Sequence, residues 1–250
     1  MDAQTRRESI CELLREKKKI RVNEIAGMFG VSAVTINNDL NILESGGIIR
    51  KNYGYAEILD DFSSISSPNI KNYAEKKRIA KAAAGLMQNN ISIAIYTGTT
   101  CLIFAREISP DLNLIVVTCS LPVAVEIGRK PRVNTILIGG DYNAPNFSTY
   151  GLMAVKQLES FNLDMLFMSV DGISADNGCT IDQYFEADIN ATLIRNAKKV
   201  VLMADYTKIG VTKFIKIADI SDIDIIVTDD KIPEKEKEKL QHLGTEMIIV

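Results

Sequence analysis

Small polar residues and glycines follow five short apolar runs in the later part of the chain. The first run, residues 91–96, leads directly into Thr97-Gly98-Thr99-Thr100. Hydroxyls and backbone N–H groups at the start of a helix form a natural phosphate site, because the helix N-terminus carries partial positive charge. We expect the ligand-binding residues at the five ends to be Thr97, Gly98, Thr99, Thr100, Cys119, Ser120, Leu121, Gly139, Gly140, Asp171, Asp205 and Lys208.

The elements that must position these residues are strands of one sheet. Short runs rich in β-branched residues alternate with helical or turn segments, after a predicted helix around residues 73–87. This pattern is typical of a parallel α/β sheet that is covered on both faces, and ligands bind such sheets at the carboxyl ends of the strands. The predicted strands are 91–96, 114–118, 133–138, 165–170, 200–204, 223–228 and 246–250.

The chemistry at the strand ends suits a polyol phosphate better than an apolar ligand. Hydroxyls, glycines and acids occur together there, and Asp205 and Lys208 place a carboxylate and an ammonium at one rim. Taken singly, each turn is also explained by ordinary loop chemistry, since Gly, Thr, Ser and Asp are common turn formers.

The first sixty residues predict a helix-turn-helix. Apolar spacing indicates a first helix over residues 6–18, and Asn23 could cap a second helix that ends at Gly30. Ser32 could cap a third helix that continues to Gly46-Gly47. Three helices with a short glycine turn before the last one match this motif.

The outward face of the third helix carries small polar residues that fit a major groove. Asparagine can pair with an adenine edge, and a β-hairpin with a turn at residues 52–54 forms a basic wing. We expect DNA contacts from Ser32, Ala33, Thr35, Asn37, Asn38, Asn41, Arg50 and Lys51, with further cations at Lys17, Lys18, Lys19 and Arg21. The alternative is a helical protein-interaction module whose polar face is solvated.

Composition narrows the class of protein. Hydrophobic residues make up 46% and charged residues 24%, which is enough apolar material for a core. His242 is the only histidine, and the four cysteines lack metal-ligand spacing, so we expect buried free thiols, no metal and no cofactor. No stretch reaches the roughly 18 apolar residues of a membrane span, and we expect a cytosolic protein. Residues 1–59 carry a net charge of +1 and residues 60–250 of −4, so DNA contacts depend on local placement of charge.

The segment VNEIAGMFGVSAVTINNDLNILESGGIIRKNYGYA resembles the helix-turn-helix of the DeoR family of regulators. The order of the strand-end turns is similar to the sensor domain of that family, which is related in fold to ribose-5-phosphate isomerase and binds sugar phosphates. The resemblance implies that Gly98, Thr99 and Thr100 form the phosphate turn. It assigns Ser120-Leu121 and Gly139-Gly140 to the next two loops, and Asp205 and Lys208 to a late Asp-x-x-Lys motif.

This chain departs from the family pattern at both predicted sites. Asn37-Asn38 replace two arginines, and 52–55 replace a His-Gly-Gly wing, so the operator sequence cannot be taken from relatives. Tyr96-Thr97 replace Asp-Ser and Cys119 replaces Asn, so the phosphate end of the ligand site is kept better than the sugar end. We expect a phosphorylated ligand with an altered polyol part, or a domain that has lost sensing.

These observations predict an α/β protein with an N-terminal winged helix-turn-helix (1–59), a linker (60–70) and an effector-binding domain (71–250) whose sheet is mainly parallel. We expect a homo-oligomeric repressor of a carbohydrate-metabolism operon that a phosphorylated sugar releases from, or rearranges on, double-stranded operator DNA. The alternative is a sugar-phosphate isomerase with an accessory N-terminal module. Its base would be Asp171, Asp205 or Glu186, with Lys208 as electrostatic partner.

Overall fold

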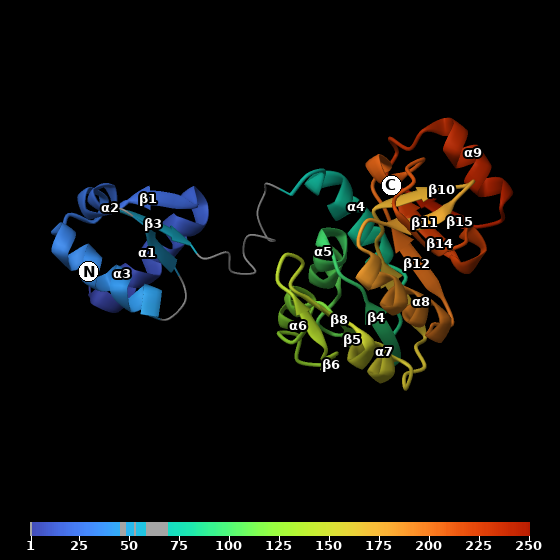
Figure 1. Ribbon diagram of the computed structural model, residues 1–250, viewed down its shortest axis with the longest axis horizontal. Helices are drawn as coiled ribbons and strands as arrows, with labels where there is room; N and C mark the ends of the chain where they lie inside the picture. The colour runs from blue at the N-terminus through green and yellow to red at the C-terminus, as the bar shows by residue number, and fades with distance from the viewer. Residues whose placement is uncertain (1, 46–48, 53, 59–69) are drawn as a thin grey trace. The chain divides into compact units, whose positions relative to one another are not determined.

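Two compact units make up the chain, Met1–Pro68 and Asn69–Val250, hereafter the N-terminal and C-terminal units (Figure 1). The computed structural model describes residues 2–45, 49–52, 54–58 and 70–250. Several predicted features lie outside the described residues: the Gly46-Gly47 helix end, Tyr53 of the wing turn, and residues 60–69 of the expected linker.

Three helices begin the N-terminal unit: α1 (Ala3–Lys17), α2 (Val22–Phe29) and α3 (Ala33–Ser45). Asp2 caps α1 by accepting hydrogen bonds from the backbone N–H groups of Gln4 and Thr5. The predicted cap of α2 is wrong, because the helix begins before Asn23 and no side chain caps it. The N–H of Val22 instead donates to the carbonyl of Gly54, so a wing residue distant in sequence satisfies this helix end.

The turn before α3 has the predicted chemistry. Gly30 adopts the left-handed conformation, with φ of 62°, where a side chain would be strained. The Ser32 hydroxyl accepts a hydrogen bond from the N–H of Thr35 at 3.1 Å, which is the interaction of an N-cap residue.

A small antiparallel sheet completes the N-terminal unit. Strands β2 (Ile49–Asn52) and β3 (Tyr55–Ile58) form the predicted wing, and β1 (Lys19–Arg21) adds to its other edge in the order β1-β3-β2. Strand β1 was not predicted, because three residues between two helices are too few to show an alternation of apolar and polar side chains. The buried core joins all three helices to the sheet and includes Ile10, Leu14, Ile25, Ile36, Leu40, Ile49 and Ala56.

A parallel sheet organises the C-terminal unit. Its seven strands lie in the order β15-β14-β12-β9-β4-β5-β6, and every neighbouring pair is parallel. All seven coincide with predicted runs: β4 (Ile91–Ile95), β5 (Leu114–Thr118), β6 (Val133–Leu137), β9 (Met165–Met168), β12 (Val200–Met203), β14 (Ile225–Thr228) and β15 (Glu246–Ile249).

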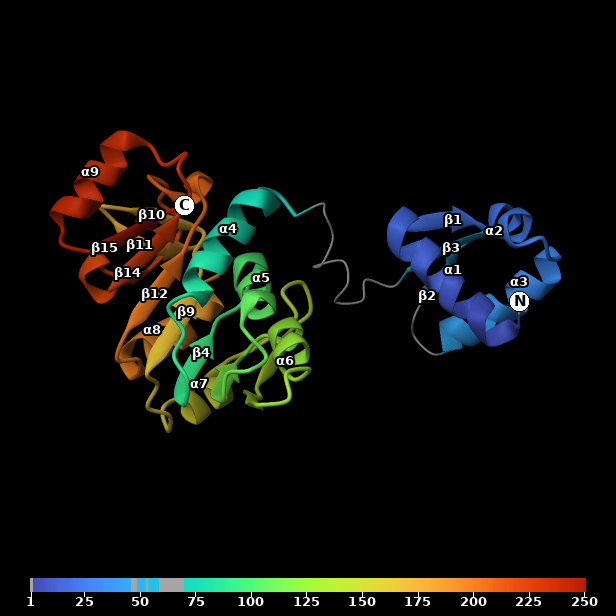
Figure 2. The same cartoon turned by 180° about the vertical axis from the view of Figure 1, so that it is seen from behind.

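Helices cover both faces of this sheet, as the burial of its central strands requires. The helices are α4 (Tyr73–Ala84), α5 (Thr99–Glu107), α6 (Leu121–Ile127), α7 (Leu152–Leu158), α8 (Ala187–Asn196) and α9 (Glu234–His242). Helix α4 packs on α5 and α5 on α6 across one face, whereas α7 and α8 pack together on the other (Figures 1 and 2). Short 3-10 turns η2 (Tyr184–Glu186), η3 (Tyr206–Lys208) and η4 (Ile220–Asp222) connect some elements.

Two small antiparallel sheets were not predicted. The hairpin of β7 (Asp141–Asn143) and β8 (Ser148–Tyr150) follows β6. Strands β10 (Gly172–Ser174), β11 (Gly178–Ile181) and β13 (Ile215–Ala218) pair in that order. The hairpin and the β10–β11 pair fall on segments that we had interpreted as loops. Among the described residues, no helix has the length and hydropathy that crossing a bilayer demands.

Candidate functional site

The exposed face of α3 carries some of the predicted DNA-contact residues but not all of them. Asn38 and Asn41 are exposed, whereas Asn37 is half-buried and its amide donates to the carbonyl of Ala33 at 2.9 Å. Asn37 is therefore turned back onto its own helix. The hydroxyls of Ser32 and Thr35 lie 2.9 Å apart at the start of α3.

The wing contacts the same helix. Lys51 of β2 donates from Nζ to the Asn41 carbonyl oxygen at 2.6 Å, and its backbone N–H donates to the Glu44 carboxylate at 2.8 Å. The neighbouring Arg50 is exposed. The two predicted wing cations thus differ: Lys51 is engaged with α3, and Arg50 remains in solvent.

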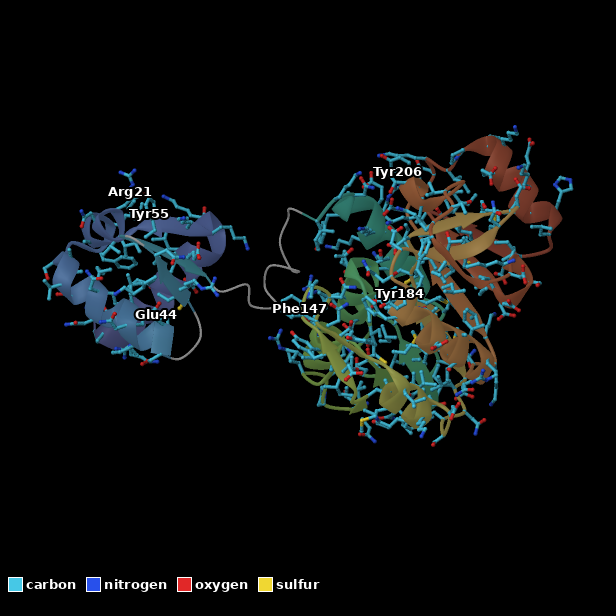
Figure 3. The ribbon with its side chains drawn as sticks, in the orientation of Figure 1. Arg21, Glu44, Tyr55, Phe147, Tyr184 and Tyr206 are labelled. Carbon is cyan, nitrogen blue, oxygen red and sulfur yellow. The ribbon has the colours of Figure 1, made fainter. Side chains whose placement is uncertain are left out.

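Further cations surround a pocket of about 410 Å³ beside the start of α2. Arg21 donates from Nε to the hydroxyl of Tyr55 at 2.7 Å, and the Lys19 ammonium lies 4.9 Å from the centre of the same ring. Figure 3 shows Arg21 and Tyr55 next to each other on this surface. The lining residues are Arg21, Val22, Asn23, Asn37, Gly54 and Tyr55.

A buried ion pair holds α3 against α1. The Nε atom of Arg6 lies 2.6 Å from a carboxylate oxygen of Asp39, and Arg7 contacts the other oxygen at 3.7 Å. The hydrogen bond to Asp39 raises the pKa of Arg6. Asp39 is 3% exposed, so its charge depends on these partners. Asp39 was not among the residues that the sequence predicted to be functional.

The predicted ligand-binding turns of the C-terminal unit lie at one edge of the parallel sheet. Strands β12, β9, β4, β5 and β6 are neighbours in that order, and each turn follows the carboxyl end of one of them. The structure therefore brings the five turns to the same edge. Within these turns, some side chains are exposed to solvent, some are buried in the core, and others lie against the β7–β8 segment.

The turn after β4 leads directly into the N-terminus of a helix, beside a buried lysine. Gly98 is the N-cap of α5 with φ of 105°, a conformation that favours glycine, and α5 begins at Thr99. The Lys76 ammonium, from α4, lies 3.0 Å from the Thr99 hydroxyl. Lys76 is 9% exposed, and desolvation lowers its pKa. Lys76 was not predicted, because nothing in the sequence distinguishes it from the other lysines of α4.

Asp205 and Lys208 have different partners. Asp205 is buried and accepts hydrogen bonds from the Asn72 amide at 3.0 Å and the Thr207 N–H at 3.1 Å. Its other oxygen lies 3.9 Å from Lys76 Nζ. Lys208 instead contacts Asp171 at 3.7 Å. The rim thus contains two separate lysine–aspartate pairs.

The hairpin β7–β8 covers the turn after β5. The N–H of Thr149 donates to the carbonyl of Cys119 at 2.9 Å, and Leu121 donates to Phe147 at 2.9 Å. Cys119 and Ser120 are both buried, and the Ser120 hydroxyl accepts from the N–H of Val123 as the N-cap of α6. The polar groups of this turn are therefore largely used within the protein.

Contacts within the protein explain the structure around Gly139 and the need for glycine at Gly140. The side-chain amide of Gln157 forms hydrogen bonds to both the N–H and the carbonyl of Gly139. A Cβ atom at Gly140, where φ is 155°, would lie 2.4 Å from the carbonyl oxygen of Tyr150. Both glycines were predicted to bind a ligand, whereas packing against β8 already requires glycine at Gly140.

A buried polar cluster lies behind Tyr96, one of the residues that depart from the family pattern. The Tyr96 hydroxyl donates to Glu186 at 2.8 Å and accepts from the Asn190 amide at 2.8 Å. Asn146, from the hairpin, donates to the second Glu186 oxygen at 2.9 Å. Burial, and then the Glu186 carboxylate, raise the pKa of Tyr96 well above its ordinary value. Glu186 thus forms part of a hydrogen-bonded cluster that explains its burial without catalysis.

The cysteines give a direct test of this packing. All four are buried free thiols, and burial raises the pKa of Cys101, Cys119 and Cys179 to about 12. Since the thiolate is the reactive form, we expect them to react with iodoacetamide at pH 8 more than about a thousandfold more slowly than free cysteine. Mass spectrometry of the native protein, with urea-unfolded protein as control, checks this. Rapid native labelling of Cys119 would contradict the structure.

No group of three or more His, Cys, Asp or Glu side chains among the described residues is placed to hold a metal ion. The described geometry consists of a winged helix-turn-helix with an exposed helix face and an α/β unit whose glycine and hydroxyl turns lie at one edge of a parallel sheet. This combination is typical of a transcription factor that responds to a ligand.

Comparison with known proteins identifies the family. Residues 6–62 match the DeoR-like helix-turn-helix domain, and residues 71–230 match the DeoR C terminal sensor domain. The HTH-type transcriptional regulator GolR of Listeria innocua is 34% identical over 96% of this chain and 95% of its own length. The transcriptional repressor AccR of Agrobacterium fabrum is 28% identical over 94% of this chain and 96% of its own. This chain belongs to the DeoR family of transcriptional regulators.

The family assignment decides between the two functions that the sequence left open. The relatives matched along the chain are regulators, so the protein is a transcriptional regulator and not an isomerase. A ribose 5-phosphate isomerase from Methanocaldococcus jannaschii is similar in fold, with a TM-score of 0.41 and 16% identity over 56% of this chain and 55% of its own. The assignment rests on the sequence matches.

Proposed function

We propose that this protein represses a carbohydrate-metabolism operon and that a phosphorylated sugar, or a related metabolite, releases it from or rearranges it on double-stranded operator DNA. Residues 1–59 would bind the DNA, 60–70 would link, and 71–250 would bind the effector. As a protein that acts on chromosomal DNA, it would function in the cytosol.

The observation that carries the effector proposal is the buried Lys76 beside the start of α5. A desolvated ammonium favours an anionic partner, and the Asp205 oxygen that faces it lies 3.9 Å away, which is beyond hydrogen-bond distance. The hydroxyl of Thr99 and the N-terminus of α5 lie at the same place. These three groups would bind a phosphoryl group together.

The polyol part of the effector would lie toward the Tyr96–Glu186 cluster. Glu186 is 8% exposed and keeps acceptor capacity beyond its hydrogen bonds from Tyr96 and Asn146, and the buried side-chain oxygen of Asn190 has no partner among the described residues. Acceptors suit the hydroxyl donors of a sugar. This differs from the Asp-Ser and Asn of the family pattern and supports an altered polyol part.

A homo-oligomer is part of the proposal. One N-terminal unit of low net charge would bind DNA weakly, and two linked units on paired half-sites would bind far more tightly. Light scattering of the purified protein would measure the assembly. A monomer on the operator would contradict this part.

The decisive experiment is a gel shift with the DNA upstream of the protein's own gene, with and without a panel of phosphorylated sugars. We expect binding at low salt that at least one phosphorylated sugar weakens, while its unphosphorylated form does not. A thermal-shift screen with the same panel identifies the ligand, because a ligand of the native state raises stability. No DNA binding under any condition would contradict the proposal.

A further inference from the structure

The recognition helix α3 lacks every side chain that commonly reads a G·C base pair by charge. Its sequence, AVTINNDLNILES, contains no lysine or arginine, the residues that most often contact guanine. An acid could accept from the cytosine amino group, but Asp39 is buried against Arg6 and Glu44 accepts from the backbone of Lys51. Direct contacts from α3 must therefore be uncharged.

Only one of the three asparagines on α3 is both exposed and unengaged within the described part of the chain. The Asn37 amide donates to Ala33, and the Asn41 oxygen accepts from Lys51. Asn38 is exposed, and no partner for its side chain is found among the described residues. An asparagine that is free in this way can form two hydrogen bonds with the N6 and N7 atoms of adenine.

Val34 lies one turn before Asn38 on the same face of the helix. Its side chain is 71% exposed, although valine is apolar and the first turn of α3 is otherwise polar at the surface. Apolar side chains at such positions contact the C5-methyl group of thymine. Four helical residues span about 6 Å, which corresponds to roughly one or two base-pair steps of about 3.4 Å.

We propose that α3 recognises A·T base pairs, with Val34 contacting a thymine methyl group and Asn38 the edge of an adenine one or two steps away. This inference rests on the proposed binding of operator DNA and adds the base composition of the half-site. The sequence pattern did not include Val34, and it gave the adenine contact to all three asparagines alike. Arg50 and the cations beside the α2 pocket would contact the phosphates on either side.

The test uses chemically altered operator duplexes. A footprint first defines the half-site, and its thymines are then replaced one at a time by deoxyuridine, which lacks only the methyl group. In separate duplexes each adenine is replaced by 7-deazaadenine, which lacks only N7. For the wild-type protein we expect one uracil position to weaken binding about fourfold and one 7-deazaadenine position to weaken it at least about tenfold.

Two variants show which residue is responsible for the weaker binding of the uracil and 7-deazaadenine duplexes. Val34→Ala should bind the thymine and uracil duplexes equally while keeping its sensitivity to 7-deazaadenine, and Asn38→Ala should show the reverse. Val125→Ala is the matched control, because Val125 is an exposed valine of α6 in the C-terminal unit, and it should keep both sensitivities. Circular dichroism melting confirms that the variants are folded, as exposed substitutions predict.

The possible outcomes separate this inference from the function on which it rests. If the wild-type protein binds its upstream DNA but is indifferent to every uracil and 7-deazaadenine position, the recognition of A·T pairs is wrong and DNA binding stands. The same conclusion follows if Val34→Ala still discriminates thymine from uracil. If the protein binds no duplex, the proposed function and this inference both fail.

Discussion

Replacing Asp39 with alanine is expected to destabilise the N-terminal unit, so that it is largely unfolded at 37 °C, while the C-terminal unit stays folded. The change removes the buried carboxylate that bonds to Arg6 at 2.6 Å, so the arginine loses its partner between α1 and α3. Breaking a buried, hydrogen-bonded ion pair costs about 3 kcal/mol. A unit of this size has a total stability of only about 3–9 kcal/mol. Urea unfolding of the full chain should show the first of two transitions shifted to lower concentration.

The affinity of Asp39→Ala for DNA distinguishes two opposite outcomes. If α3 stayed folded, removing a negative charge from the recognition helix would strengthen DNA binding, since the duplex is an anion. Loss of the ion pair should instead abolish binding at 37 °C and partly restore it in the cold. Glu12→Ala is the matched control, because Glu12 is an exposed acid of α1. Tighter binding by Asp39→Ala at 37 °C would show that the ion pair is dispensable.

Replacing Lys76 with methionine is expected to remove the response to the effector. The ammonium lies 3.0 Å from the Thr99 hydroxyl at the N-terminus of α5, where we place the phosphoryl group. Losing a buried charged hydrogen bond to a ligand weakens binding by about a hundredfold. The titration of phosphorylated sugars by calorimetry, and of their effect on DNA binding by gel shift, measures the loss.

The free energy of unfolding should change little in the Lys76→Met variant. Desolvation, which lowers the pKa of Lys76, works against the folded state, whereas attraction to Asp205 works for it. A lysine whose folded-state pKa is lowered opposes folding at neutral pH, and this cost fades as the pH rises through the folded-state pKa. Methionine keeps the length of the side chain and relieves that cost. Lys77→Met, at an exposed neighbour, is the control. A Lys76→Met protein that still responds to the effector would refute the proposed phosphate site.

Periodicity along the chain was sufficient for the main architecture. The central sheet strands were predicted because a strand buried on both faces must be apolar throughout, and that property is local. The edge strands β6 and β15 are only partly buried, but each still carries a short apolar run. The turn before α3 was also predictable, because it depends on the backbone conformation of Gly30 and on a hydrogen bond between Ser32 and a residue three positions later. Gly98 at the start of α5 was found in the same way.

Contacts between distant segments could not be read in this way. The N–H of Val22 is satisfied by a wing carbonyl, so α2 does not use Asn23 as a cap. The three-residue strands β1, β7, β8 and β10 exist because a partner strand is present, and three residues carry too little pattern to predict them.

The difference between what the sequence determines and what tertiary packing determines is clearest at the proposed effector site. Residue types alone placed glycine and hydroxyl groups at the strand ends, because strand, turn and helix follow one another in the chain. Which charges meet there depended on tertiary packing: α4 brings Lys76 to Thr99, and Glu186 reaches Tyr96 from a segment 90 residues later. Local structure follows from backbone geometry and neighbouring side chains. Pairing between remote side chains is decided only when helices and strands pack into a common core.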